Sequence, residues 1–316
     1  MKKVLVISTG GTIACVRTPN GLAPGLSGRE ILSCAGSLPE LALSFESIAS
    51  VDSTDISPAI WEKLVVSVSR AFHAYDGVLI LHGTDTMEYT AALISNLFSD
   101  TPVPVVFTGS MMPPGDPESD APRNLHDALT LITGGVKGVY LVFGGKCIFG
   151  DRAVKLMTED LVAFRSGDRR FAGTFDEDGM HRTPGPYAPP RKMLDMPEHL
   201  SAKVLFVKLT PDTDSGIFRY LVDQGYDGCV LSGFGAGGVP RKHIGALREA
   251  LRRGIIFVMN SQCVFGDIRF EKYLTGWEAE SLGILSAEDM TDACALTRLL
   301  ILLSLTKEIP RIRAEF

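Results

Sequence analysis

Two threonines that follow glycine turns are the residues of this chain best suited to catalysis. Thr12 follows the apolar run 4–7 and a glycine pair, and Thr84 follows the apolar run 77–81 and a glycine. Both runs predict strands of a parallel sheet, whose carboxyl ends meet at the edge where open α/β sheets bind ligands. Asp85 comes directly after Thr84, so this edge would present two hydroxyls and a carboxylate. The pattern indicates hydroxyl chemistry.

A threonine hydroxyl is a poor nucleophile unless a neighbouring base or the local electrostatics activates it. Lys155 is a candidate base, although most lysines are solvated surface residues. Thr84, Asp85 and Thr86 also have a structural interpretation. The helical pattern 87–98 follows them, and Thr or Asp before a helix usually serves as its N-cap. Sequence position alone does not separate these alternatives.

The segment 13–27 after the first threonine resembles a lid more than a phosphate loop. A phosphate loop would carry Gly-Lys-Ser/Thr, and a dinucleotide turn would open directly into a helix. This segment instead contains the turn signals Pro19, Asn20-Gly21 and Pro24-Gly25. Such signals are typical of loops that close over a substrate, so we expect a mobile lid here.

Residues 233–238 formally match Gly-x-Gly-x-x-Gly, the fingerprint of dinucleotide binding. The acid that binds the ribose should end the next strand, but the run 255–259 ends in Asn260-Ser261-Gln262. The motif therefore predicts a glycine-rich turn, with a subunit contact as one option, and not an NAD site.

Short apolar runs alternate with helical patterns along most of the chain. The runs are continuous in Val, Ile and Leu, which is typical of strands covered by helices on both faces. The expected strands are 4–8, 77–82, 103–108, 139–143, 204–209, 229–232 and 255–260. The expected helices are 58–72, 87–98, 120–133, 240–253 and 286–305, the last with Asp289 or Thr291 as its cap. This alternation predicts an α/β fold with a parallel sheet.

A proline-rich segment, 183–190, interrupts the pattern and divides the chain. Because 316 residues exceed the usual size of a single domain, we predict two domains. They are a large N-terminal parallel-sheet domain at 1–183 and a smaller C-terminal α/β domain at 203–316, joined by a linker at 184–202.

Composition argues against several classes of protein. A net charge of −6 and a pI near 5.6 argue against a nucleic-acid-binding surface. No apolar stretch reaches the roughly 18 residues of a membrane span, and no signal peptide is evident, so we expect no membrane association and a cytoplasmic location. The cysteines lack Cys-x-x-Cys spacing and the histidines lack His-x-x-x-His spacing, which argues against a bound metal and against disulfides.

Segments spread along the chain together resemble the bacterial-type L-asparaginases, the threonine amidohydrolases of the asparaginase/glutaminase family. Residues 9–14 (TGGTIA) match the first signature of that family, and residues 82–88 (HGTDTME) match the second. The other similar segments are 51–55, 108–111, 119–124, 150–155 and 289–297. The resemblance covers essentially the whole chain, and two signatures at this separation are highly specific.

The resemblance implies a role for each site residue. Thr12 would attack the side-chain amide, and Lys155 would act as a base through Thr84. Asp85 would belong to the same catalytic group and would hold the α-ammonium of the substrate. Ser53 and backbone donors of its turn would hold the α-carboxylate. The implied binding residues are Gly11, Asp52, Ser53, Thr54, Thr84, Asp85 and Ser110.

The family often carries a tyrosine in the loop after the first signature, where it helps to activate the first threonine. Segment 13–27 has no tyrosine, and Leu22 lies near the expected place. The proton acceptor for Thr12 would then be Tyr187, a neighbouring subunit's tyrosine or water. We therefore expect modest activity with low glutamine turnover.

The resemblance also implies a homodimer or homotetramer with active sites near the subunit boundary, and no cofactor. Gly238 stands where the family often has an asparagine that reaches the neighbouring site. Asp267 or Glu271 would supply the acid of the neighbouring subunit, and the sequence does not choose between them.

The function implied is hydrolysis of L-asparagine to L-aspartate and ammonia through an acyl-threonine intermediate, an asparaginase reaction of asparagine catabolism. One alternative is an amidase or glutaminase of the same family that acts on another amide. The other is a non-catalytic relative that binds asparagine or aspartate. Binding alone needs only Asp85 and the Ser53 turn, so the presence of Thr12, Thr84 and Lys155 speaks against it.

Overall fold

The computed structural model describes residues 1–19, 21–36, 40–168, 170–184 and 191–316. Within these ranges the chain forms two compact units, unit 1 at Met1–Met193 and unit 2 at Leu194–Phe316. The predicted linker, 184–202, includes residues 185–190, which lie outside the described residues.

Unit 1 is built on a sheet whose strands are β1 Lys2–Gly10, β4 Leu41–Val51, β5 Gly77–Leu81, β6 Pro104–Thr108, β7 Gly138–Phe143, β8 Lys146–Phe149, β11 Gly173–Asp176 and β12 Gly179–Arg182. Their order is β12-β11-β8-β7-β6-β5-β1-β4. The strands from β4 to β7 run parallel, whereas β8, β11 and β12 extend the sheet antiparallel. Because β4, β1 and β5 are parallel neighbours, the loops that follow them meet at one edge.

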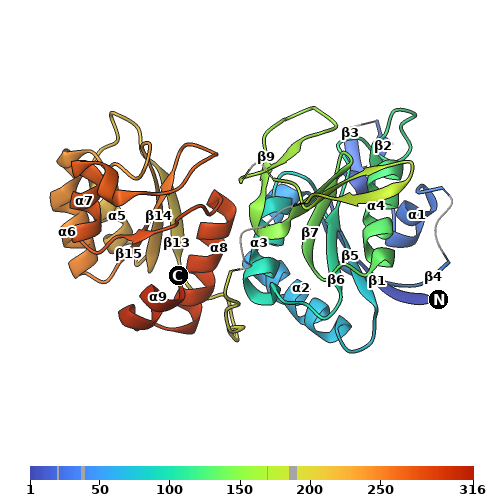
Figure 1. Ribbon diagram of the computed structural model, residues 1–316, viewed down its shortest axis with the longest axis horizontal. Helices are drawn as coiled ribbons and strands as arrows, with labels where there is room; N and C mark the ends of the chain where they lie inside the picture. The colour runs from blue at the N-terminus through green and yellow to red at the C-terminus, as the bar shows by residue number, and fades with distance from the viewer. Residues whose placement is uncertain (20, 37–39, 169, 185–190) are drawn as a thin grey trace. The chain divides into compact units, whose positions relative to one another are not determined.

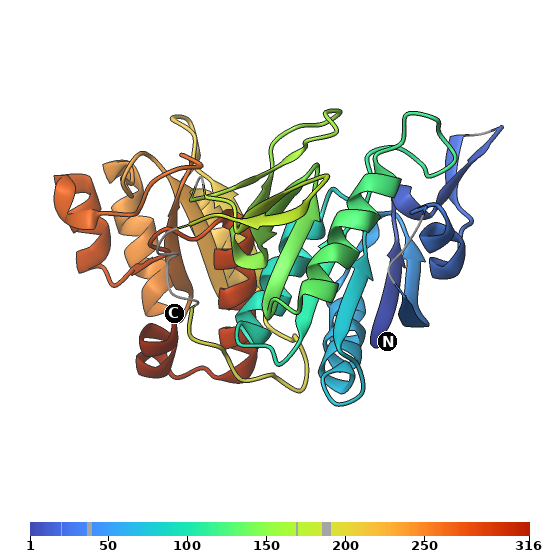
Figure 2. The same cartoon turned by 45° about the vertical axis from the view of Figure 1, so that its right-hand side comes forward.

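Helices cover both faces of this sheet. Helices α2 Pro58–Ala71 and α3 Met87–Phe98 lie on one face, and α1 Gly28–Ser33 and α4 Ala121–Gly134 lie on the other (Figure 1, Figure 2). Every residue of β5 and β6 is buried, which explains why their sequences are continuously apolar.

Unit 2 has a smaller parallel sheet of β13 Val204–Lys208, β14 Gly228–Gly233, β15 Ile256–Ser261 and β16 Leu285–Ser286, in that order. Helices α5 Gly216–Asp223 and α6 Ile244–Arg252 lie on one face, and α8 Asp292–Leu305 lies on the other (Figure 1). Helices α7 Leu274–Ser281 and α9 Ile309–Glu315 complete the unit. The predicted α/β class, with a large N-terminal and a smaller C-terminal sheet, is confirmed.

Short elements connect these layers. They are the strands β2 Cys15–Thr18, β3 Gly21–Pro24, β9 Ala153–Lys155 and β10 Phe164–Ser166, and the 3₁₀ turns η1 Thr12–Ala14, η2 Ser53–Asp55, η3 Gly150–Arg152, η4 Arg241–His243 and η5 Phe270–Lys272.

The structure adds detail at three places. Segment 13–27, predicted as a mobile lid, contains the antiparallel hairpin β2–β3. The strand β4 was not predicted, because it is a half-exposed edge strand whose serines and Glu46 interrupt the apolar run. The helix predicted at 286–305 is α8, which begins at Asp292. Its N-cap is Thr291, one of the two predicted caps, whose side chain accepts a hydrogen bond from Cys294 N at 3.1 Å.

Among the described residues, no helix is both long enough and apolar enough to span a membrane. The same residues contain no group of three or more His, Cys, Asp or Glu side chains that could hold a metal ion.

Candidate active site

Glycines allow three loops to touch at the carboxyl edge of the unit 1 sheet. Gly11 has a φ of +82°, and a Cβ added there would lie 2.2 Å from the Cα of Gly83. A Cβ added to Gly83 would lie 2.7 Å from the Cβ of Ser53. Gly11 N also donates a hydrogen bond to Val51 O at 2.9 Å. The loops after β1, β4 and β5 are therefore in direct contact, which any side chain at these glycines would prevent.

Thr12 begins the turn η1 at this junction and is half-buried. The next two residues, Ile13 and Ala14, are buried and anchor the turn in the core. No hydrogen bond of the Thr12 hydroxyl is found within the described part of the chain. Thr12 thus stands on a buried turn, and its hydroxyl is not used in the described part of the fold.

Lys155 brings the second threonine and its acidic neighbour together. Its Nζ lies 2.8 Å from Thr84 Oγ1 and 2.5 Å from Asp85 Oδ1. The contact with Thr84 that we predicted is present. The side chain of Lys155 is 13% exposed and that of Asp85 is 55% exposed, so the ammonium is shielded while the carboxylate remains open to solvent.

Of the three residues that precede α3, Thr86 takes the N-cap position, and Thr84 and Asp85 do not. The N-cap of α3 is Thr86, whose side chain makes no capping hydrogen bond. Thr86 Oγ1 instead donates to Ser53 O at 2.7 Å. Thr86 therefore links its loop to the Ser53 turn, whereas Thr84 and Asp85 contact Lys155.

The turn η2 after β4 carries the predicted carboxylate-binding residues. Asp52 Oδ1 accepts hydrogen bonds from Thr54 N and Thr54 Oγ1, both at 2.8 Å, and these bonds lower the pKa of Asp52. Asp52 and the Thr54 amide are thus occupied in shaping the turn. Ser53 is buried, and its Oγ accepts a hydrogen bond from Asp85 N at 3.2 Å.

His82 holds the loop that carries Thr84, a role that the sequence did not reveal. Trp61 Nε1 donates to Thr90 Oγ1 at 2.9 Å, Thr90 Oγ1 lies 2.9 Å from His82 Nε2, and His82 Nδ1 lies 2.7 Å from Gly83 O. A carbonyl only accepts, so the network assigns the proton of a neutral imidazole to Nδ1. Burial of the ring lowers the pKa of His82 to about 4. His82 is therefore neutral and holds the Gly83 carbonyl.

Ser110, the remaining predicted binding residue, follows β6 and has no exposed surface. Its Oγ donates to Met112 O at 2.6 Å. Asp120, which belongs to one of the segments similar to the family, shapes this loop by accepting hydrogen bonds from Met111 N at 3.0 Å and Met112 N at 3.1 Å. Burial raises the pKa of the Asp120 carboxyl. In the described residues, Ser110 makes no hydrogen bond to Thr12, Thr84 or Lys155.

The hairpin β2–β3 follows Thr12 directly. Its Arg17 forms a 2.6 Å ion pair with Asp116, which lies in the loop after Ser110. Leu22, near the place expected for the family tyrosine, is 50% exposed. The alternative proton acceptor Tyr187 lies outside the described residues.

The predicted site residues of unit 2 lie in its loops. Residues 234–238 form a tight turn, in which Gly238 N donates to Phe234 O at 2.8 Å. Asp267 forms an ion pair with Arg269 at 3.2 Å, and Glu271 is exposed in η5.

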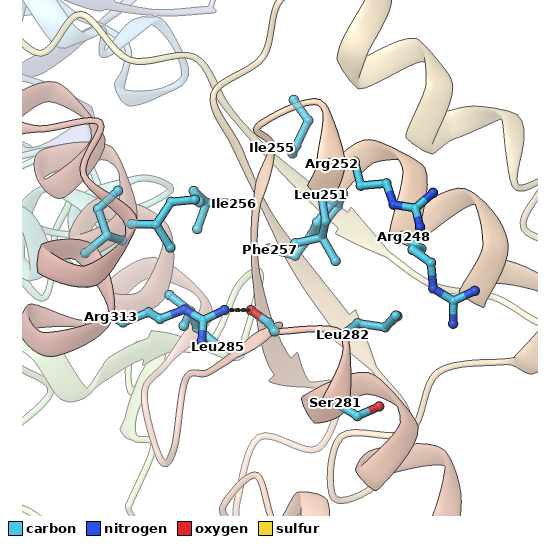
Figure 3. A pocket seen from close by; sticks show the side chains of 13 residues that line it. Arg248, Leu251, Arg252, Ile255, Ile256, Phe257, Ser281, Leu282, Leu285 and Arg313 are labelled. Atoms are coloured by element: carbon cyan, nitrogen blue, oxygen red, sulfur yellow. Dashed lines mark hydrogen bonds between the residues drawn. The ribbon is translucent and has the colours of Figure 1, made fainter.

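A cavity of about 370 Å³ lies within unit 2, between α6, α7, β15 and α9. Arg248 and Arg252 stand on one side of it and Arg313 on the other (Figure 3). Arg313 donates to Gly283 O at 3.2 Å, and Arg252 lies in the last turn of α6, where a cation complements the helix carbonyls. Structural roles therefore account for these two guanidinium groups, and the lining contains none of the predicted site residues.

Two family models match the chain and together cover most of it. Residues 3–185 match the model described as Asparaginase, N-terminal, and residues 203–316 match the Glutaminase/Asparaginase C-terminal domain. The chain is 37% identical to the L-asparaginase of Thermococcus kodakarensis, over 98% of this chain and 95% of that protein. It is 31% identical to a subunit of the Glutamyl-tRNA(Gln) amidotransferase of Pyrococcus abyssi, over 99% of this chain and 74% of that protein.

Solved structures give the same result. The thermostable L-asparaginase from Thermococcus kodakarensis matches with a TM-score of 0.89 and 35% identity, over 99% of this chain and 96% of that one. A probable cytoplasmic L-asparaginase from Campylobacter jejuni matches with a TM-score of 0.83 and 26% identity, over 100% of this chain and 99% of that one.

Proposed function

The chain belongs to the asparaginase family, and we propose that it hydrolyses L-asparagine to L-aspartate and ammonia. The observation that carries this proposal is the contact of Lys155 Nζ with Thr84 Oγ1 at 2.8 Å and with Asp85 Oδ1 at 2.5 Å. This group lies beside the Thr12 turn, since Gly11 and Gly83 are in backbone contact. One sheet edge therefore carries a nucleophile, a proton-transfer pair and an exposed carboxylate.

Thr12 acts as the nucleophile. Its oxygen attacks the side-chain amide carbon of asparagine, and the proton of its hydroxyl passes to the amide nitrogen, which leaves as ammonia. The substrate is then joined to Thr12 as an ester. Water attacks the same carbon, one proton of the water returns to the Thr12 oxygen, and aspartate is released.

Thr84 and Lys155 move these protons. Thr84 is 5% exposed and contacts the shielded ammonium end of Lys155, so the pair is largely protected from bulk water. The Thr84 hydroxyl can give a proton on one side while it takes one on the other. We infer that Lys155 acts through this hydroxyl and not by direct contact with the substrate.

Asp85 and Ser53 recognise the amino-acid part of the substrate. The exposed carboxylate of Asp85 binds the α-ammonium. The Ser53 hydroxyl accepts from Asp85 N, which leaves its own proton for the α-carboxylate. Because Thr54 N–H is bound to Asp52, the backbone donors of this turn are fewer than the family resemblance implied.

Measurement of ammonia release from L-asparagine, L-glutamine, their D-forms and peptide-linked amides tests the proposal. L-Asparagine should give the highest turnover and glutamine a low one. Release from the other amides without release from L-asparagine would contradict it.

A second candidate is an amidohydrolase that releases ammonia from another amide, such as glutamine. The 31% identity to a Glutamyl-tRNA(Gln) amidotransferase polypeptide over 99% of this chain favours it. The same panel of amides separates the two functions, because this candidate requires glutamine or a linked amide to be preferred over asparagine.

We also propose that the protein acts in the cytoplasm as a homodimer or homotetramer on a free amino-acid amide. The similarity to a probable cytoplasmic L-asparaginase supports the location. Light scattering of the purified protein measures the oligomeric state, and a monomer that is fully active would contradict the assembly.

A further inference from the structure

Lys155 is the last residue of the short strand β9, and its backbone N–H does not bond to the neighbouring strand β10. In the described residues, β9 pairs only with β10, in a two-stranded sheet. Lys155 lies opposite Phe164, and Leu156 N donates to Ala163 O at 2.9 Å. Hydrogen-bonded and non-hydrogen-bonded pairs alternate along an antiparallel ladder, so the N–H of Lys155 points away from β10.

The carboxylate of Glu88 supplies the missing partner, because its Oε2 accepts a hydrogen bond from Lys155 N. Glu88 is half-buried and lies in the first turn of α3, three residues after Asp85. Hydrogen bonds to an ionised group are about twice as strong as those between neutral groups. The segment that contacts the Lys155 ammonium through Thr84 and Asp85 therefore also holds its backbone.

We propose that Glu88 is a positioning residue that sets the distance between Lys155 Nζ and Thr84 Oγ1. This inference rests on the proposed function, in which Lys155 acts through Thr84. Lysine carries its charge on a flexible four-carbon stem, so the place of the ammonium depends on where the backbone is fixed. A displacement of about 1 Å at a reacting group can cost about 100-fold in rate.

Two substitutions at Glu88 separate the hydrogen bond from the charge. Glu88→Ala removes the acceptor, and it should lower kcat by about 10- to 100-fold while KM for asparagine changes by less than about 3-fold. Glu88→Gln keeps an acceptor oxygen at the same distance from the backbone. It should recover most of the lost kcat.

Hydrogen exchange at the Lys155 amide gives a second readout, which depends on the contact itself. Exchange should be faster in Glu88→Ala than in the wild-type protein and close to wild type in Glu88→Gln. Glu249→Ala, which removes an exposed carboxylate from α6 in unit 2, is the control and should change neither exchange nor kcat. If the alanine variant does not fold, Glu88→Leu replaces it as the variant without an acceptor.

The outcomes are distinct from those of the proposed function. A kcat of Glu88→Ala within about twofold of wild type, or a glutamine variant no better than alanine, overturns the positioning role. If the wild-type protein releases no ammonia from asparagine, the proposed function fails. The exchange of the Lys155 amide then still shows whether Glu88 holds it.

Discussion

Thr12 and Thr210 each follow a strand at the carboxyl edge of a parallel sheet, one in unit 1 and the other in unit 2. Thr210 Oγ1 donates to Asp212 Oδ1 at 2.7 Å and lies 3.0 Å from Thr213 Oγ1. The hydroxyl of Thr12 has no such partner within the described part of the chain. The same topology thus gives one hydroxyl that stabilises its own loop and one that remains available to a substrate.

The polar side chains of the unit 2 edge bond to backbone carbonyls, whereas the lysine of the unit 1 edge does not. In unit 2, Gln262 Nε2 donates to Leu209 O at 2.6 Å and to Ser232 O at 3.0 Å. Lys242 Nζ donates to Pro211 O at 2.8 Å. In unit 1, Lys155 reaches a hydroxyl and a carboxylate instead of backbone carbonyls. Chemistry therefore follows from which side chains the loops bring together, and not from the fold itself.

Removing the Thr12 hydroxyl should have the largest effect and tests its contrast with Thr210 directly. Thr12→Ala should lower kcat for asparagine by at least about 1,000-fold, because the acyl-enzyme cannot form. The free energy of unfolding should change by less than about 1 kcal/mol, since the hydroxyl makes no hydrogen bond to the residues that the structure describes. Thr210→Ala is the matched control and should keep normal turnover. Near-normal ammonia release by Thr12→Ala would end the idea that this threonine is acylated.

Replacing the lysine should have the next largest effect. Lys155→Met should lower kcat by at least about 100-fold, because proton transfer through Thr84 is lost, while calorimetry should still detect aspartate binding at Asp85 and Ser53. Lys242→Met, which removes the lysine of the other edge, should leave turnover unchanged. Loss of aspartate binding with retained turnover in Lys155→Met would contradict this assignment.

Sequence patterns predicted the strand ends and the residue types of this edge, but not the contacts that support it. The continuous apolar runs identified β1 and β5, and the position of Thr12 and Thr84 at their ends follows from them. Lys155 lies 71 residues from Thr84, and only the family resemblance indicated that they meet. The role of Glu88 depends on a hydrogen bond to a residue 67 positions away, and that of His82 on side-chain contacts with Thr90 and Gly83. Neither follows from a periodic pattern in the sequence.

The buried imidazole of His82 should make stability depend on pH. Its pKa falls from 6.5 in the unfolded chain to about 4 in the folded protein, so between these values only the unfolded state takes up the proton. Folding is therefore weakened as the pH falls from 6.5 to 4, by about 3 kcal/mol for this group. Urea unfolding at pH 7 and at pH 4.5 measures the effect. His82→Gln should lose this part of the pH dependence, and an unchanged slope in the variant would refute the assignment.

The structural amide of unit 2 should affect stability without affecting chemistry. Gln262→Leu removes the side-chain donor to Leu209 O and one of two donors to Ser232 O, which still accepts from Leu209 N. It should lower the free energy of unfolding by about 1–3 kcal/mol. The kcat of the folded variant should remain normal at temperatures well below its unfolding transition. A fall in kcat with no change in the urea midpoint would show that this edge takes part in the reaction, and it would remove the contrast between the two sheets.

The smallest effect is expected in the hairpin beside Thr12. Leu22 is 50% exposed on β3, so a tyrosine there replaces a solvent-exposed side chain and should not disturb the core. If Thr12 lacks a hairpin tyrosine to help its activation, Leu22→Tyr should raise kcat for asparagine or leave it unchanged. Steady-state ammonia release from asparagine and glutamine measures this, with Leu22→Phe as the control that adds the ring without the hydroxyl. A large loss in Leu22→Tyr, or high glutaminase activity in the unmodified protein, would show that Thr12 is activated in another way.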